Sequence, residues 1–216
     1  MSHTSGIRQA RKQKTRQALL DAALELLEAQ SLSSLGLREV TRAVGIAPTA
    51  FYRHFRSVED LGVALVEEAL GSLHPMIRTI VSTTGDGEER VARAVELIAG
   101  HVDAHPAHVR FIARERHGGV RAVREAIRDQ LALFTVEVAE ALAKDPVSAG
   151  WGEEDLAMLA QLYVDQMLVT ASALLEAPVR GAERERVVRM AARRMRLIGI
   201  GRAHWLDGGM GGGGGG

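Results

Sequence analysis

The segment from Leu37 to Leu61 constrains this 216-residue chain more than any other part of it. It holds a short stretch with apolar residues at helical spacing, then Gly45, then a second short stretch that begins at Pro48. Glycine readily adopts the positive φ of a sharp turn, and proline is tolerated in the first turn of a helix. The pattern predicts helices over about 37–44 and 48–55, the layout of a helix-turn-helix that places its second helix in DNA.

The composition favours an all-helical protein. Aromatic residues are only 4% of the chain, Ala, Leu, Arg and Glu are abundant, and no regular apolar and polar alternation predicts a strand. The chain has no cysteine, which excludes disulfides and thiolate metal sites and fits a reducing compartment. The N-terminus is polar and basic, and no apolar stretch is expected to approach the length of a membrane span. We therefore expect a cytoplasmic protein that does not contact a membrane.

The charge is distributed unevenly, although the whole chain balances 27 basic against 27 acidic residues. Residues 1–56 hold nine Lys or Arg and four Asp or Glu, so this segment is +5 and the remainder is −5. A basic first turn does not suit a helix macrodipole, which favours anions at an N-terminus. Contact with the phosphates of a polyanion explains the basic run from Arg11 to Arg16 better than helix stability does.

Apolar periodicity divides the chain into a small and a large domain. It predicts a first helix over about 12–29 and later helices over about 88–104, 107–117, 120–143, 153–177 and 183–205. Ser57 and Asp60 have the spacing of a capping box that starts another helix, which the dipeptide His74-Pro75 bends or ends. The predicted domains are residues 1–56, residues 57–206, and a disordered glycine-rich tail over 207–216.

The stretch 153–177 is apolar around nearly its whole circumference. Such a helix must be buried on several sides, so one side can face the interior and another a second copy of the chain. The helix over 183–205 could complete a four-helix interface between the two subunits. The sequence therefore predicts a homodimer.

Residues 15–61 closely resemble the TetR family of bacterial repressors. The resemblance lies in the opening TRQALLDAALELL of the first helix, the turn at Gly45, the segment APTAFYRHF, and the pair Asp60-Leu61. It implies an all-α fold with an N-terminal three-helix helix-turn-helix DNA-binding domain and a C-terminal helical ligand-binding and dimerisation domain. It also implies a ligand-responsive repressor that binds a palindromic operator. Val58 stands where many members have a lysine, so one phosphate contact is not expected here.

Carried over position by position, the resemblance implies two sets of DNA-contacting residues. Arginine can bridge the O6 and N7 atoms of guanine, and an alanine can touch a thymine methyl. The residues expected at the sugar-phosphate backbone are Arg16, Thr41, Thr49, Tyr52 and His54, and those expected near base edges are Arg38, Arg42, Ala50 and Arg53. Phe51 and Phe55 are four residues apart, and we assign them to the core rather than to base stacking.

The phrases GIAPTAFYRHF and FIARERHGG are similar to the FabR and DesT type repressors of unsaturated fatty acid synthesis. This second resemblance implies no cofactor but an effector that is a long-chain acyl-CoA, or an acyl chain on acyl carrier protein. Apolar residues of the large domain could line a tunnel for the chain, and Arg110, Arg114, Arg116 and His117 could meet the coenzyme A phosphates. The residues proposed for the ligand site are Phe111, Arg114, Phe134, Tyr163 and Met167.

Three alternatives compete with this interpretation. His101 and His105 are four apart as in zinc sites, but Pro106 follows and no H-E-x-x-H arrangement is present, so we expect no metal site. No Walker loop, no G-x-S-x-G elbow and no dinucleotide fingerprint occur, so we expect no enzyme. A TetR-type regulator of an efflux or catabolic operon that senses a drug-like or aromatic molecule remains the other candidate.

Overall fold

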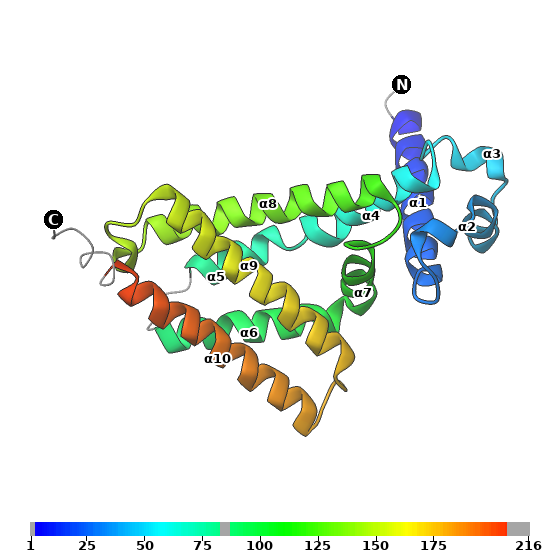
Figure 1. The fold of residues 1–216 in the computed structure, drawn as a ribbon. Helices are drawn as coiled ribbons and strands as arrows, with labels where there is room; N and C mark the ends of the chain where they lie inside the picture. Colours follow the sequence, from blue (N-terminus) through cyan, green and yellow to red (C-terminus); the bar gives the residue numbers. More distant parts are fainter. Residues whose placement is uncertain (1–2, 83–86, 207–216) are drawn as a thin grey trace. The chain divides into compact units, whose positions relative to one another are not determined.

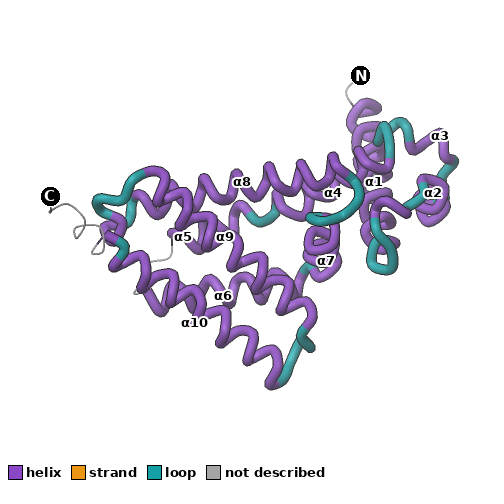
Figure 2. Tube along the Cα trace, in the orientation of Figure 1, coloured by secondary structure: helices purple, strands orange, loops and turns teal. Residues whose placement is uncertain are grey.

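The computed structural model describes residues 3–82 and 87–206, and every regular element in those ranges is a helix (Figures 1 and 2). The predicted all-α class is confirmed. The predicted disordered tail over 207–216 lies outside the described residues. The chain forms two compact units: Met1–Gly71 with Ala107–Asp129, and Ser72–Pro106 with Gln130–Gly216.

The first unit contains the predicted helix-turn-helix. Its helices are α1 (His3–Leu26), α2 (Leu37–Val44), α3 (Pro48–Phe51), α4 (Val58–Gly71) and α7 (Pro106–Glu115), with a 3-10 turn, η1, over Leu32–Ser34. Helix α1 packs against α2 and α4, and α2 packs against α3. Leu19, Ala23 and Leu27 follow one another at helical spacing along α1 and the turn that ends it, and all are buried. The core of the unit also contains Phe51 and Phe55, as the sequence predicted.

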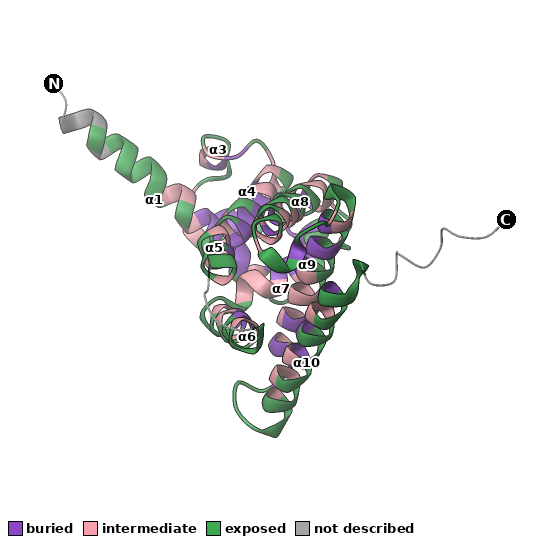
Figure 3. Cartoon of the chain, turned by 90° about the vertical axis from the view of Figure 1, so that its left-hand side faces the viewer, coloured by how far each residue is buried: buried purple, intermediate pink, exposed green. Residues whose placement is uncertain are grey.

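Helix α1 differs from its predicted range of 12–29 at both ends. It begins by His3, and the part of it before Thr15 for which burial is described is exposed (Figure 3). It ends at Leu26, where the amides of Glu28 and Ala29 donate to carbonyls only three residues back. These tighter bonds close the helix, as is common at helix ends.

The helix-turn-helix and the segments after it form one unit, whereas the predicted small domain ended at residue 56. Gly62 of α4 packs directly against the side chains of Leu32 and Val123, so closely that a Cβ atom at Gly62 would collide with them. The carboxylate of Glu115 is also buried in this unit, where it accepts a hydrogen bond of 3.0 Å from the Leu32 amide. Contacts between residues far apart in the sequence therefore join α4, α7 and the start of α8 to the DNA-reading helices.

The second unit is built on a layer of long helices. It contains α5 (His74–Ser82), α6 (Gly87–Ala104), most of α8 (Arg121–Ala143), the 3-10 turn η2 (Pro146–Ser148), α9 (Glu153–Glu176) and α10 (Ala182–His204). Helices α6, α9 and α10 pack against one another, α5 lies against α6, and η2 lies against α10. The predicted helix ends in this unit agree with the structure to within one or two residues.

Met158, Leu162 and Val169 of helix α9 are 41%, 48% and 48% exposed in the single subunit. Helix α9 therefore leaves uncovered the kind of apolar side that the sequence analysis assigned to a second copy of the chain. It is also long and apolar enough to span a membrane by length and composition alone, with an 18-residue window of mean hydropathy 1.3, so the expectation that no stretch approaches that length is wrong. A core helix of a water-soluble domain can have the same composition, and α9 packs against α6 and α10.

Candidate functional site

The turn between α2 and α3 has the geometry that its sequence predicts. Gly45 caps α2 in the left-handed conformation, with φ 72° and ψ 32°, and its amide donates to the carbonyl of Arg42. Ala47 is extended, and Pro48 occupies the first turn of α3. The chain therefore reverses between two short helices that pack against each other, as in a helix-turn-helix.

Helix α3 is shorter than the predicted range of 48–55 and ends at Phe51. The amides of Arg53 and His54 donate to carbonyls three residues back, so the chain continues past Phe51 as tight turns. Phe55 still donates to the Phe51 carbonyl at 3.1 Å, and the two rings lie 5.6 Å apart in the core. The segment after α3 is thus held in place by Phe51 and Phe55 even though it is not regular helix.

Most of the predicted DNA-contacting side chains are available to a partner. Tyr52 is 62% exposed, and Ala50, His54 and Arg16 are partly buried. The exposed arginines and threonine of the set are Arg38, Arg42, Arg53 and Thr49. The structure brings these residues from α1, α2 and α3 into the same unit, where they remain candidates for DNA contact.

Thr41 is the exception, and the prediction that it contacts DNA is corrected. Its side chain is only 1% exposed, and its hydroxyl donates to the carbonyls of Leu37 and Arg38 at 3.0 and 3.2 Å. Thr41 follows Val40 on the buried side of α2, so it stabilises the packing of the helix and does not face a groove.

The charges around His54 make this edge of the unit strongly electropositive. Burial, then the charges of Lys12, Arg16 and Arg53, lower the pKa of His54 below its ordinary value of 6.5. The guanidinium carbon of Arg16 lies 4.4 Å from the centre of the Phe55 ring, a cation–π contact that fixes this arginine beside the core. The exposed Arg8, Arg11 and Lys14 of α1 add further positive charge. Such a cluster suits phosphates.

The start of α4 is capped as predicted. The Ser57 hydroxyl accepts a hydrogen bond of 3.1 Å from the Asp60 amide, and the Asp60 carboxylate accepts one of 2.9 Å from the Arg56 amide. The hydrogen bonds from Arg56 hold the pKa of Asp60 below its usual range. The chain therefore passes from the helix-turn-helix into α4 in a fixed conformation.

A cavity of about 630 Å³ lies within the second unit, among α5, α6, α8, α9 and α10. This volume is within the range of small-molecule sites. Of the predicted ligand residues, Tyr163 and Met167 line the cavity. Burial raises the pKa of the Tyr163 hydroxyl, so this group is neutral and can serve as a hydrogen-bonding group at neutral pH.

The other three predicted ligand residues do not line this cavity. Phe134 is 3% exposed and packs against the ring of His74, 4.7 Å away, rather than lining the cavity. Phe111 is buried in the core of the first unit. Arg114 donates to the carbonyls of Leu27 and Gln30 at the end of α1. Arg110 of the same proposed cluster is paired with Glu28 at 3.1 Å.

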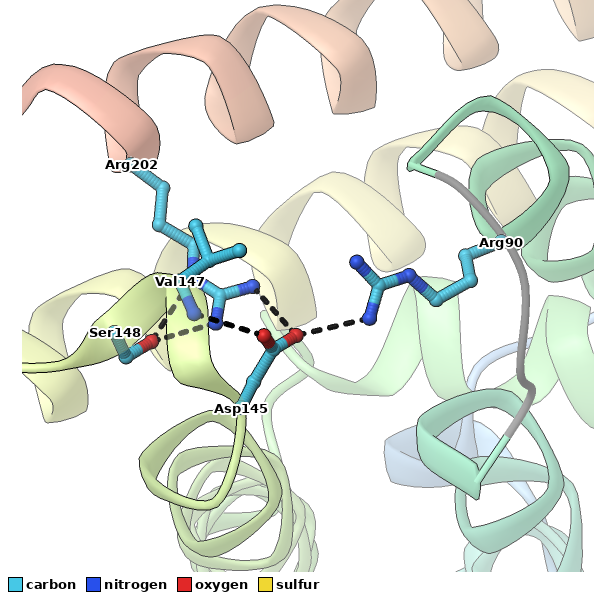
Figure 4. Close-up of polar contacts among 5 residues, drawn as sticks. All are labelled: Arg90, Asp145, Val147, Ser148 and Arg202. Atoms are coloured by element: carbon cyan, nitrogen blue, oxygen red, sulfur yellow. Dashed lines mark hydrogen bonds and ion pairs between the residues drawn. The ribbon is translucent and has the colours of Figure 1, made fainter.

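The polar end of the cavity was not predicted. Asp145 Oδ2 accepts hydrogen bonds from Arg90 at 2.9 Å and from Arg202 at 3.3 Å (Figure 4). Arg202 also donates to the Ser148 hydroxyl, and the Val147 amide donates to Asp145 Oδ1. Burial disfavours the Asp145 anion, but the hydrogen bonds from Val147 and Arg90 and the charges of Arg202 and Arg90 outweigh it and hold the pKa of Asp145 below its usual range. These residues are far apart in the sequence, and no local motif links them.

Among the described residues, no group of three or more His, Cys, Asp or Glu side chains is arranged to hold a metal ion. The rings of His101 and His105 lie 4.8 Å apart at the end of α6. A pair of imidazoles without further ligands is not a structural zinc site.

Residues 19–65, which contain the helix-turn-helix, match the family model described as "Bacterial regulatory proteins, tetR family". This segment of the chain therefore has a DNA-binding domain of the TetR type, and the remaining residues lie outside the match. Members of this family are regulators of transcription rather than enzymes.

Solved TetR-type structures share the fold across most of the chain. A putative TetR-family regulator from Syntrophomonas wolfei is 14% identical, with a TM-score of 0.71 over 88% of this chain and 96% of that one. The fatty acid degradation regulator FadR from Bacillus halodurans is 16% identical, with a TM-score of 0.67 over 85% and 94%. FadR from Bacillus subtilis, solved in complex with stearoyl-CoA, is 15% identical, with a TM-score of 0.67 over 84% and 96%.

Proposed function

We propose that this protein is a cytoplasmic repressor that binds a palindromic operator as a homodimer. The effector that we propose is a long-chain acyl group carried as acyl-CoA. The observation that carries the proposal is the combination of an exposed, electropositive helix-turn-helix with a largely apolar cavity in a separate unit. Effector binding in one unit and DNA binding in another are the two coupled sites that a ligand-responsive repressor needs.

The reader would bind DNA through α3 and the turns that follow it. Thr49 and Tyr52 are exposed and carry hydroxyls that can donate to phosphate oxygens, while Arg38, Arg42 and Arg53 are exposed cations that can donate to base edges or phosphates. Two such readers must lie about 34 to 36 Å apart, or a multiple of that distance, to enter successive major grooves. A dimer fixes that distance.

The dimer interface is proposed on α9 and α10, which pack side by side in the second unit (Figures 1 and 3). Each presents apolar side chains to solvent at helical spacing. These are Met158, Leu162 and Val169 on α9, and Met190, Leu197 and Ile200 on α10. Two helices from each subunit would cover these faces in a four-helix interface.

Support for an acyl effector comes from the cavity and from one relative. The cavity combines aliphatic residues such as Ile77 and Leu142 with Met167, a flexible side chain that adapts to the shape of a chain. The FadR of Bacillus subtilis was solved with stearoyl-CoA. We further propose that the regulator belongs with repressors of unsaturated fatty acid synthesis, so that unsaturated acyl-CoA strengthens and saturated acyl-CoA weakens operator binding.

The test is a gel shift of the regulator on the promoter DNA of its own gene, with and without oleoyl-CoA, palmitoyl-CoA and a panel of cationic dyes. We expect the dimer to shift the promoter and the two acyl-CoAs to change the apparent affinity in opposite directions. A response to the dyes alone would replace the acyl effector with a drug-like one. No shift of any promoter fragment would contradict the repressor assignment itself.

A further inference from the structure

We propose that the cavity of the second unit binds an amphipathic anion, with its negative group held by Arg90 and Arg202 beside Asp145. This inference rests on the proposed function, because it names the chemical class of the effector that the same cavity would take. A free fatty acid carboxylate and the phosphates of an acyl-CoA offer the same chemistry, and the experiment below distinguishes them.

The charges at the polar end of the cavity are unbalanced. Arg90 and Arg202 both donate to one oxygen of Asp145, at 2.9 and 3.3 Å, so two guanidinium cations share a single carboxylate (Figure 4). Arg202 is only 7% exposed and Asp145 is 17% exposed, so water screens this pair weakly, whereas Arg90 is 37% exposed and can be reached by a ligand. Within the part of the chain that the structure describes, this cluster therefore has a net positive charge, and an anion in the cavity would neutralise it.

The remaining charged groups of the cavity do not supply that counter-ion. Glu88 also lines the cavity, but its carboxylate pairs with Arg196 at 2.6 Å, and both side chains are more than half exposed. The other titratable groups of the lining are His204 and Tyr163, whose hydroxyl is neutral. The lining as a whole contains three guanidinium groups and two carboxylates, so it favours an anion over a neutral or cationic ligand.

Donors for that anion are present. An arginine has five N–H donors, and within the described residues Arg90 uses Nη1 alone, on Asp145. Its other N–H groups can donate to a ligand carboxylate or phosphate while the bond to Asp145 remains. Hydrogen bonds in which both partners are charged are shorter and stronger than neutral ones, so they can select an anionic end group.

The apolar remainder of the cavity requires a hydrocarbon part on the ligand. Aliphatic side chains from α5, α6 and α8, among them Ile77, Val91 and Val138, share the cavity with the arginines. A compact inorganic anion would leave this surface in contact with water. An anion that carries an apolar chain would bury it, which provides a hydrophobic contribution that phosphate or sulfate alone lacks.

Intrinsic tryptophan fluorescence can report ligand binding in this cavity. Its two tryptophans, Trp151 and Trp205, have ring centres 6.0 Å apart, and Trp205 directly follows His204 of the cavity lining. Arg202, three residues before Trp205, is bonded to Ser148 and Asp145. A ligand that engages Arg202 should therefore change the intrinsic fluorescence.

The experiment titrates full-length protein with laurate, lauroyl-CoA and lauryl alcohol, which share one chain and differ in the end group. We expect one or both anions to bind at least about tenfold more tightly than the alcohol. Tighter binding of laurate would identify a carboxylate, and tighter binding of lauroyl-CoA would identify phosphate groups. Equal binding of all three ligands, or no binding of any, would overturn the proposal.

Two variants locate the site, with a third as the matched control. Arg90→Gln should remove the preference for the anions, whereas Arg93→Gln, on the same helix but in a surface pair with Glu96, should retain it. Because Asp145 keeps its bond to Arg202, Arg90→Gln should fold, which its thermal melt checks. Gly199→Leu should place a side chain in the cavity and weaken the binding of all three ligands. An anion preference that survives Arg90→Gln, or ligand binding unchanged by Gly199→Leu, would place the ligand elsewhere.

Gel shifts on the same samples separate this inference from the proposed function. Acyl-CoA that alters operator binding without any anion preference would leave the repressor proposal standing and remove the anion site. Anions that bind through Arg90 but leave operator binding unchanged would confirm the anion site and remove the proposal that an acyl ligand controls operator binding.

Discussion

The guanidinium of Arg114 donates a hydrogen bond of 2.6 Å to the carbonyl oxygen of Gln30. The same Nη1 atom also donates to the Leu27 carbonyl at 2.7 Å, so a side chain of α7 occupies carbonyls at the end of α1. Leu27 and Gln30 lie just beyond Leu26, the last residue of α1, where carbonyls lack partners within the helix and a cation also suits the helix macrodipole. The end of the first helix of the DNA reader therefore depends on a residue from the middle of the chain.

Loss of this cap should destabilise the protein. We expect Arg114→Ala to lower the free energy of unfolding by roughly 1 to 2 kcal/mol, because carbonyls lose a charged donor. Urea denaturation would measure the change. Arg121→Ala, which removes an exposed pair with Glu125 within one helix, should change stability by less than about 0.5 kcal/mol. Equal losses of stability in the two variants would show that the hydrogen bonds of Arg114 stabilise the protein no more than an exposed ion pair does.

A substitution at the turn of the helix-turn-helix should destabilise the protein through the backbone conformation that the turn requires, not through a steric clash of the new side chain. Gly45 has φ 72°, and no neighbouring group of the described chain lies within 4 Å of the place that a Cβ atom would take. Gly45→Ala should therefore cost about 1 kcal/mol from the backbone alone. Gly36→Ala is the matched control, since Gly36 is equally open but has φ −90°. Thermal melts of both variants would check this, and a fully stable Gly45→Ala protein would contradict it.

His54 should make stability depend on pH. Its pKa is lowered in the folded protein, so as the pH falls below about 6.5 the unfolded chain takes up a proton before the folded one does. The native protein should therefore lose stability below that pH, and His54→Gln should lose less. Urea denaturation at about pH 7.5 and about pH 5.5 would compare them, and identical losses would mean that His54 is not perturbed.

The proposed dimer can be tested with two equally exposed residues. Leu197 on α10 is 69% exposed and Val179, in the segment between α9 and α10, is 66% exposed. We expect Leu197→Glu to convert the dimer to a monomer, since the charge would be buried in the interface, and Val179→Glu to remain dimeric. Sedimentation velocity would report the masses. A dimeric Leu197→Glu protein would exclude this face of α10.

The helix-turn-helix was predictable because its signals are local. Gly45 and Pro48 set the turn, and the spacing of Leu37, Val40 and Val44 sets the buried face of α2. The same spacing places Thr41 next to Val40, so its burial could also have been predicted from the helical period, but the resemblance to known DNA readers favoured a phosphate contact. Where local pattern and family resemblance disagreed, the local pattern was correct.

The remaining differences arise from contacts between distant parts of the sequence. The end of α1 depends on Arg114, and the polar end of the cavity depends on Arg90, Asp145 and Arg202, which no spacing rule connects. The predicted ligand residue Phe134 is aromatic and on the inward stripe of its helix, yet its neighbour is His74 rather than the cavity. Inward-facing residues are predictable from periodicity, but which of them border a cavity is not.

The most direct test of the account is operator binding by a reader whose exposed residues are removed. Tyr52 and Arg53 are exposed beyond the end of α3, so the double variant Tyr52→Ala, Arg53→Ala should keep the wild-type melting temperature and dimeric mass. Fluorescence anisotropy with a duplex from the regulator's own promoter should show an affinity at least about tenfold weaker than wild type. A double variant that binds this duplex as tightly as the wild type does would contradict the claim that α3 and the turns after it read DNA.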